Sequence, residues 1–262
     1  MSRKVSKITL TTAALTSALL LGALGGCSRD ESTATLLAEA KQYQQKGDTK
    51  AALIQLKNAV SKSPEDAEAR LQLGTLYVET ADPVSAEKEL RKAASLGAPA
   101  ERVLPQLARA LQSQGKFKET LDELKPELVA KSAPLLALRG DALLAQNQQD
   151  EAKKSYEAAL ALQANNGAAL TGLARHALVN RDAEAAERYA TEAITKDANN
   201  ADVWMFRGGM LRATGKSDEA VKAFDKVLAL RPNDRNANVE KAYIRIEQGK
   251  YAEARAEIEA GR

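Results

Sequence analysis

The residue types best suited to chemistry are scarce in this chain, which has one cysteine, Cys27, and one histidine, His176. A metal site or an acid–base centre needs partner side chains at fixed spacing, and none accompanies His176. A single cysteine also excludes an intramolecular disulfide. The sequence has no glycine-rich phosphate loop and no nucleophile elbow. It therefore predicts that the protein is not an enzyme, holds no metal ion and uses no cofactor, with a structural or surface role for His176.

The surroundings of Cys27 suggest that it is modified covalently. Residues 1–7 are basic, and the apolar run Ile8–Ala23 follows them. As a helix this run would be about 24 Å long, shorter than the roughly 30 Å hydrocarbon core of a bilayer. The pattern favours a cleaved signal peptide over a transmembrane helix.

The tetrapeptide Leu24-Gly25-Gly26-Cys27 looks like a bacterial lipobox, in which the cysteine thiol accepts diacylglycerol. We therefore expect a lipoprotein signal peptide at residues 1–26 and a lipidated tether at residues 27–32. The alternative is an ordinary signal peptide followed by a cysteine by chance. By similarity to Gram-negative lipoproteins, aspartate after the cysteine favours the inner membrane, so Ser28 indicates the outer membrane. The expected location is the cell envelope, lipid-anchored in the outer membrane and facing the periplasm.

The charge of the chain gives no reason to expect a nucleic-acid partner. The formal net charge is +3, and the expected leader carries Arg3, Lys4 and Lys7 without an acidic residue. Removal of the leader would leave a neutral chain, which lacks the basic surface that binds phosphate backbones.

From Thr33 onward the sequence repeats itself about every 34 residues, most clearly in 67–98 and 201–232. This is the tetratricopeptide pattern, in which each repeat is a helix–turn–helix unit that buries its apolar face against its neighbours. We expect an all-α, right-handed α-solenoid of about seven repeats over residues 33–262. Position 1 of the repeats falls at Thr33, Ala67, Glu101, Ala133, Gly167, Ala201 and Arg235.

Small and large residues recur at fixed positions, as expected where two helices pack closely. Position 8 is always small: Ala40, Gly74, Ala108, Gly140, Ala174, Gly208 and Ala242. Position 24 is usually large: Leu56, Leu90, Leu124, Tyr156, Ala190, Phe224 and Ile258. The pattern predicts that position 24 of the second helix packs on position 8 of the first.

Three features depart from a regular array: the residue type at some turns, the length of the third repeat and the end of the last repeat. Glycine at position 15 (Gly47, Gly115, Gly215 and Gly249) suits the left-handed turn between helices, whereas Ala81, Asn147 and Arg181 replace it elsewhere. The third repeat is two residues short and contains Lys125-Pro126, which predicts a local kink. The last repeat stops at Arg262 without a polar capping helix, so we expect it to be truncated and the natural protein to continue.

Residues 36–97, with the blocks AALIQLKNAV, DAEARLQLG and AEKELRKA, resemble one family in particular. It is the TPR-repeat lipoprotein family of PEP-CTERM/exosortase systems, found in bacteria that make exopolysaccharide. The resemblance covers the whole chain at the level of the repeat and about its first third at the level of this particular family. It implies an envelope scaffold for exopolysaccharide production or export, or for PEP-CTERM sorting, and it establishes no catalytic residue.

Binding in such arrays is expected in the concave groove, lined by positions 2, 5, 9, 12 and 13 of the first helices. The Lys and Asn pattern that grips a C-terminal carboxylate is absent. The candidate groove residues are Arg109, Leu144, Arg175, Leu178, Met205 and Arg212. An extended peptide or an amphipathic helix with some negative charge would suit them. The alternative is that they are ordinary solvated charges and packing residues between repeats.

The sequence thus leaves two functions open and disfavours a third. The first is a lipid-anchored scaffold that binds protein partners or peptides of an exopolysaccharide or PEP-CTERM system. The second is an envelope adaptor for peptidoglycan enzymes or for pilus or secretion assembly. An enzyme with a repeat domain is the third. No nucleic acid and no small-molecule substrate are expected, and the membrane is contacted through the lipid anchor.

Overall fold

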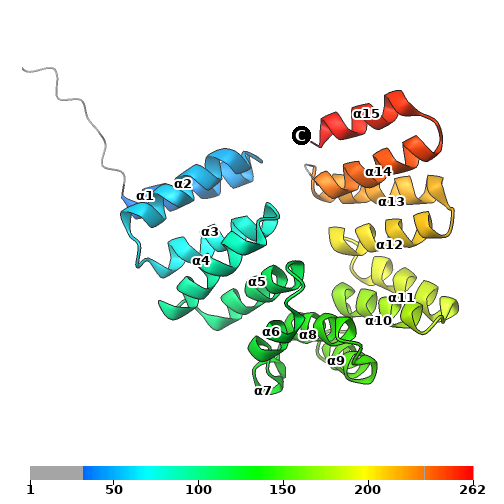
Figure 1. Cartoon of the computed structure of the whole chain (residues 1–262), viewed down its shortest axis with the longest axis horizontal. Helices are drawn as coiled ribbons and strands as arrows, with labels where there is room; N and C mark the ends of the chain where they lie inside the picture. Colours follow the sequence, from blue (N-terminus) through cyan, green and yellow to red (C-terminus); the bar gives the residue numbers. More distant parts are fainter. Residues whose placement is uncertain (1–31, 233, 262) are drawn as a thin grey trace, which may run out of the picture. The chain divides into compact units, whose positions relative to one another are not determined.

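A computed structural model describes residues 32–232 and 234–261 of the chain, and every regular element in this part is an α-helix (Figure 1). The expected signal peptide, the lipidation site Cys27 and most of the tether lie outside the described residues. Seven helices are the first of a pair: α1 (Thr33–Gln45), α3 (Ala67–Glu79), α5 (Ala100–Ser113), α8 (Ala133–Ala145), α10 (Gly167–Val179), α12 (Ala201–Ala213) and α14 (Arg235–Glu247). Their partners are α2 (Thr49–Lys62), α4 (Pro83–Ser95), α6 (Phe117–Glu123), α9 (Gln149–Leu162), α11 (Ala183–Lys196), α13 (Ser217–Leu230) and α15 (Tyr251–Ala260), and α7 (Pro126–Val129) follows α6.

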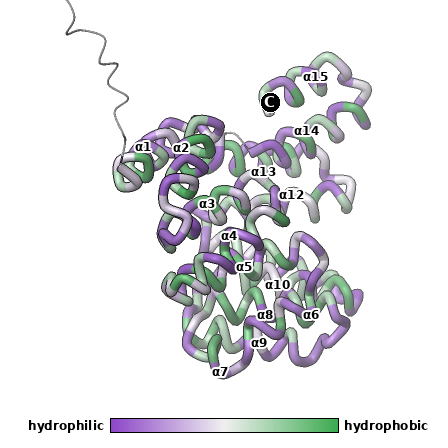
Figure 2. The backbone as a smooth tube through the Cα atoms, turned by 60° about the vertical axis from the view of Figure 1, so that its left-hand side comes forward, coloured by the Kyte–Doolittle hydropathy of each residue, from purple (hydrophilic) through white to green (hydrophobic). Residues whose placement is uncertain are grey.

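Close contact between position 8 and position 24 holds together the pairs that have glycine at position 8, as the sequence predicts, whereas Ile258 at position 24 of the seventh repeat is 39% exposed. A Cβ atom added to Gly74 would lie 2.7 Å from Cγ of Leu90, and one added to Gly208 would lie 2.5 Å from Cε1 of Phe224. Both large side chains are fully buried. At these two positions only glycine lets the helices approach this closely. Hydrophilic and hydrophobic residues alternate along the helices (Figure 2).

Turns between paired helices use the left-handed backbone conformation at position 15. Gly47 has φ of 74° and Gly115 of 73°, which glycine adopts without steric penalty. Ala81, Asn147 and Arg181 adopt nearly the same conformation, with φ of 57°, 58° and 59°. The tertiary packing of the pair thus imposes the turn even where the residue type opposes it.

Side-chain caps fix where several helices begin. Asp66, for example, accepts a hydrogen bond from the backbone N–H of Ala69 at 2.9 Å, and Asp182 accepts one from Ala185 at 2.9 Å. The same N-cap occurs at Asp48, Asp82, Asn166, Asn200 and Asp234. These caps satisfy backbone donors that the first turn of a helix leaves without partners.

The short third repeat is interrupted where Lys125-Pro126 predicts a kink. Helix α6 ends at Glu123, and α7 starts at Pro126, whose ring cannot continue the preceding hydrogen-bond ladder. The guanidinium of Arg139 donates from Nη1 to the carbonyl oxygen of Leu124 at 2.7 Å, so α8 caps the interrupted helix. Within the described residues no helix is both long and apolar enough to cross a membrane.

Candidate functional site

The first helices of neighbouring repeats lie against one another and form one face of the array, called here the first-helix face. Besides the contacts between consecutive helices, α3 contacts α5, α5 contacts α8, α8 contacts α10, α10 contacts α12, and α12 contacts α14. Within the described residues, second helices of neighbouring repeats make no comparable contacts with one another. Since first helices approach each other more closely than second helices do, their side is the inner side of the stack. All six candidate groove residues come from these helices.

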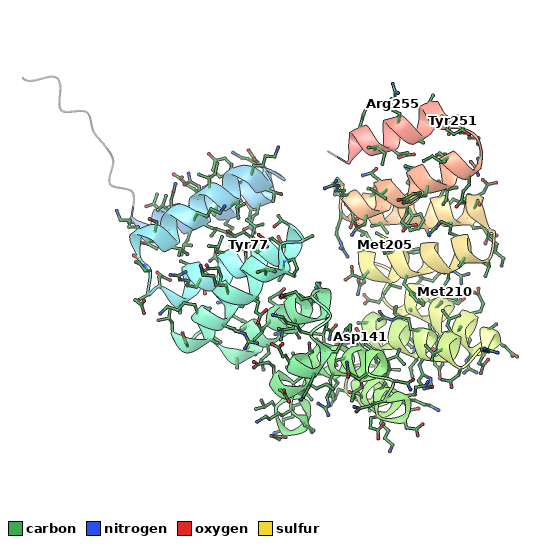
Figure 3. The ribbon with its side chains drawn as sticks, viewed as in Figure 1. Tyr77, Asp141, Met205, Met210, Tyr251 and Arg255 are labelled. Atoms are coloured by element: carbon green, nitrogen blue, oxygen red, sulfur yellow. The ribbon has the colours of Figure 1, made fainter. Side chains whose placement is uncertain are left out.

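Asp141 on α8 (Figure 3) makes polar contacts with two neighbouring helices. Its Oδ1 accepts a hydrogen bond from the Tyr156 hydroxyl at 2.8 Å and another from Nη2 of Arg175 at 3.0 Å. Burial raises the pKa of Asp141 above the usual value for aspartate, while the charges of Arg175 and Arg109 and the tyrosine hydrogen bond oppose that rise. Burial and the neighbouring carboxylate likewise raise the pKa of Tyr156. The carboxylate therefore links α8, α9 and α10.

Two of the three candidate arginines are engaged inside the array. Arg175 pairs with Asp141, and its guanidinium lies 5.9 Å from the ring centre of Phe206 on α12. Arg212 lies 2.9 Å from Glu240 and 3.6 Å from Glu247, both on α14. These contacts join neighbouring repeats, as the packing alternative expects.

Arg109 differs from the other two arginines. It is exposed on α5, and no ion pair joins it to a carboxylate in residues 32–232 and 234–261. Its charge nevertheless lies near enough to Asp141 to act on that carboxyl group. Arg109 is thus the candidate arginine that keeps its charge available to a partner.

The three apolar candidate residues also differ in how far they are exposed to solvent. Leu144 is half-buried and packs on the core formed by α8 and α9, and Met205 is half-buried against the core formed by α12 and α13. Leu178, in contrast, is 45% exposed. Sequence reasoning did not select three further exposed apolar side chains of the first-helix face: Val179 (53%), Tyr243 (54%) and Ile246 (48%). Their repeat positions, 13, 9 and 12, were the signal that could have identified them.

The single tryptophan and the single histidine of the chain, Trp204 and His176, have structural surroundings. Nε1 of Trp204 donates to the carbonyl oxygen of Ala198 at 2.7 Å, which ties α12 to the preceding turn. His176 is half-buried near Asn180, whose side-chain amide donates to the carbonyl oxygen of His176 at 2.9 Å. In the described residues, no three His, Cys, Asp or Glu side chains are grouped so that they could hold a metal ion.

Comparison with known proteins agrees with this architecture. A family described as "Tetratricopeptide repeat-like domain" matches residues 38–180, and two described as "Tetratricopeptide repeat" match residues 171–235 and 211–262. The first of these matches spans more than half of the chain, which therefore belongs to the tetratricopeptide repeat family. The predicted all-α solenoid of these repeats is confirmed. No curated protein matches the chain.

Solved structures of similar fold include one named as a pilus biogenesis factor, one named pilF and one named for a peptide-binding site. PilW, a widely conserved type IV pilus biogenesis factor, is 17% identical with a TM-score of 0.58, over 81% of this chain and 97% of PilW. Pseudomonas aeruginosa pilF is 22% identical with a TM-score of 0.53, over 84% and 99%. YrrB, a TPR protein with an unusual peptide-binding site, is 18% identical with a TM-score of 0.50, over 66% and 90%. At these identities the likeness concerns the fold.

The family and the fold define the class of protein. It is a TPR scaffold, whose surface mediates protein–protein interactions, and the first-helix face is the part of that surface where the first helices from α3 to α14 lie against one another.

Proposed function

We propose that this protein is a lipid-anchored scaffold that faces the periplasm and binds protein partners of an exopolysaccharide production, export or PEP-CTERM sorting system. The observation that carries the binding role is the group of exposed apolar side chains on first helices, which includes Leu178, Tyr243 and Ile246. Exposed apolar residues on the inner helices of a repeat array are typical of a protein-binding surface. The binding role requires no catalytic residue, so the proposal includes no enzymatic activity.

The lipid anchor and the choice of system are supported by sequence alone. The basic and apolar leader, Cys27 after two glycines, and Ser28 support an outer-membrane lipoprotein. The resemblance of the sequence of residues 36–97 to that lipoprotein family supports the exopolysaccharide and PEP-CTERM system.

A second candidate function is an envelope adaptor for pilus or secretion assembly or for peptidoglycan enzymes. The specific observation in its favour is the similarity of fold to PilW, named as a type IV pilus biogenesis factor, and to pilF. That similarity concerns the fold alone. The identity of the partner that binds to the first-helix face decides between the two functions.

Site-directed photo-crosslinking in cells tests the proposal. A photoreactive amino acid replaces Leu178 on the first-helix face, and a control variant carries it at Lys222, an exposed residue of the second helix α13. Crosslinked partners are then identified by mass spectrometry. Components of polysaccharide export or exosortase sorting, captured from Leu178 only, support the proposal. Pilus or cell-wall proteins support the second function. Equal capture from both positions would remove the first-helix face as the binding surface.

A further inference from the structure

Gly209 lies in the middle of α12, where neither packing nor backbone conformation requires a glycine. A Cβ atom added there meets no atom within 4 Å, and Gly209 is not among the residues with positive φ. The adjacent Gly208 is different, since its added Cβ would lie 2.5 Å from Cε1 of Phe224. A glycine inside a helix is less stable than an alanine. The open space over Gly209 therefore has no explanation in the packing of the array.

The position of Gly209 in the repeat places this space on the first-helix face. Gly209 is at position 9 of the sixth repeat, between Arg175 and Tyr243 at position 9 of the fifth and seventh. The ion pair between Asp141 and Arg175, which are also one period apart, shows that equal positions of adjacent repeats come within side-chain reach. By repeat position, Arg175, whose guanidinium lies 5.9 Å from the Phe206 ring centre, precedes Gly209 on the neighbouring first helix, and Tyr243 follows it on the next.

Apolar side chains occur near this position on three adjacent helices, exposed on α10 and α14 and half-buried, at Met205, on α12. We define the apolar patch as Leu178 and Val179 of α10, Met205 and Gly209 of α12, and Tyr243 and Ile246 of α14. Helix α12 contacts both α10 and α14, so the three helices lie side by side. Exposed apolar side chains on neighbouring helices favour an apolar occupant.

The charged side chains Arg175 of α10 and Asp202 and Arg212 of α12 are paired within the protein. Arg175 pairs with Asp141, Arg212 with Glu240 and Glu247, and Asp202 of α12 with Arg231. An acidic or basic partner would have to break these pairs to gain a new one, so charge complementarity favours an uncharged partner.

We propose that the apolar patch binds an uncharged, extended peptide segment of a partner protein, with one bulky aromatic side chain seated over Gly209. The inference deepens the proposed binding role of the first-helix face and depends on it. Met205, Phe206 and Tyr243 offer sulfur and ring contacts that suit an aromatic group. Packed helix axes are about 10 Å apart, so the three helices span about 20 Å, the length of about six residues of extended chain.

Selection of a displayed library of random seven-residue peptides on the full chain tests this inference. The expected result is enrichment of uncharged peptides that carry Trp, Phe or Tyr. Synthetic capped copies should bind the wild type and lose at least tenfold in affinity with Gly209→Leu, because the leucine fills the space over the helix. The matched control is Thr75→Leu, at position 9 of the second repeat, which should leave the affinity unchanged. Circular dichroism verifies that each variant is folded.

The other outcomes separate this inference from the proposed function. Peptides that bind wild type and Gly209→Leu equally, or acidic peptides whose binding is lost with Arg109→Gln, overturn the inference but leave a binding role for the first-helix face. Absence of any enriched peptide overturns both. Should Gly209→Leu fail to fold, Tyr243→Ala is the second variant, with the same tenfold loss expected and unchanged affinity as the contrary result.

Discussion

The Tyr156 hydroxyl donates a hydrogen bond to the Asp141 carboxylate across 2.8 Å, and thereby joins the second helix of the fourth repeat to its first. The ring of the same tyrosine fills the space that Gly140 and Gly172 leave free, on the first helices of its own repeat and the next. One side chain thus provides both the packing and the polar link between two repeats.

Replacing Tyr156 by phenylalanine should separate these two contributions. The ring stays in place, but Asp141 loses one of its two hydrogen bonds in a largely buried site, so we expect a loss of about 1–2 kcal/mol in the free energy of unfolding. Urea denaturation followed by circular dichroism measures the change. Tyr251→Phe, at an exposed tyrosine, is the control that should leave the midpoint unchanged. An unchanged midpoint for Tyr156→Phe would show that the hydrogen bond contributes nothing net.

The neighbours Gly208 and Gly209 should respond in opposite directions to alanine. In Gly208→Ala the new methyl group collides with the Phe224 ring, and we expect a destabilisation of about 1–3 kcal/mol. In Gly209→Ala the methyl group meets open space and removes the helix penalty of glycine, so we expect a stabilisation of about 0.5–1 kcal/mol. Thermal and chemical unfolding of the two variants check both signs. A destabilised Gly209→Ala would mean that the space over this residue is needed for folding.

Most of the fold was predictable because close packing requires the same residue sizes at every repeat. The small residue at position 8 and the large one at position 24 fix how each pair packs, and Gly74 with Leu90 confirms this. The candidate site was less predictable, because ion pairs depend on which way long side chains point. Arg175 and Arg212 have suitable positions for a ligand, yet each reaches a carboxylate of an adjacent repeat. Repeat position alone cannot separate them from Arg109.

Glycine at the strained turn residues should stabilise the array. Ala81 has φ of 57° and Arg181 of 59°, where a side chain is disfavoured by about 1–2 kcal/mol. Glycine relieves this strain but makes the unfolded chain more flexible, so Ala81→Gly should gain up to about 1 kcal/mol. Differential scanning calorimetry measures the shift in Tm. Thr80→Gly, one residue earlier with φ of −93°, is the control and should be destabilising. Equal effects at residues 80 and 81 would argue against strain at the turn.

Acid should weaken the contacts around Glu87 of α4. Burial alone would raise the pKa of this carboxyl group, but hydrogen bonds from Lys116, Arg91 and Gln114 outweigh it and lower the pKa to about 2. Because the folded pKa lies below the ordinary glutamate value of 4.5, the stabilisation is complete above pH 4.5 and is lost as the pH falls toward 2.

The variant Glu87→Gln isolates this effect. It should be about 1–2 kcal/mol less stable than wild type at pH 7, a figure that allows for solvent screening, and the difference should shrink between pH 4.5 and pH 2. Urea midpoints across this pH range provide the measurement. Glu157→Gln, at an exposed position with a 3.9 Å lysine contact, is the matched control and should differ little from wild type at any pH. A constant difference for Glu87→Gln at all pH values would exclude the proposed proton linkage.

Replacement of Cys27 tests the lipid anchor independently of the array. The thiol is the proposed acceptor of diacylglycerol, so Cys27→Ala should move the protein from the membrane fraction to the soluble periplasmic fraction. Fractionation with immunoblotting measures the distribution. Ser28→Asp keeps the thiol and serves as the control: it should remain in the membrane fraction but shift from the outer to the inner membrane. If Cys27→Ala stayed in the membrane fraction in the same amount, some other part of the chain or a partner would have to hold it there.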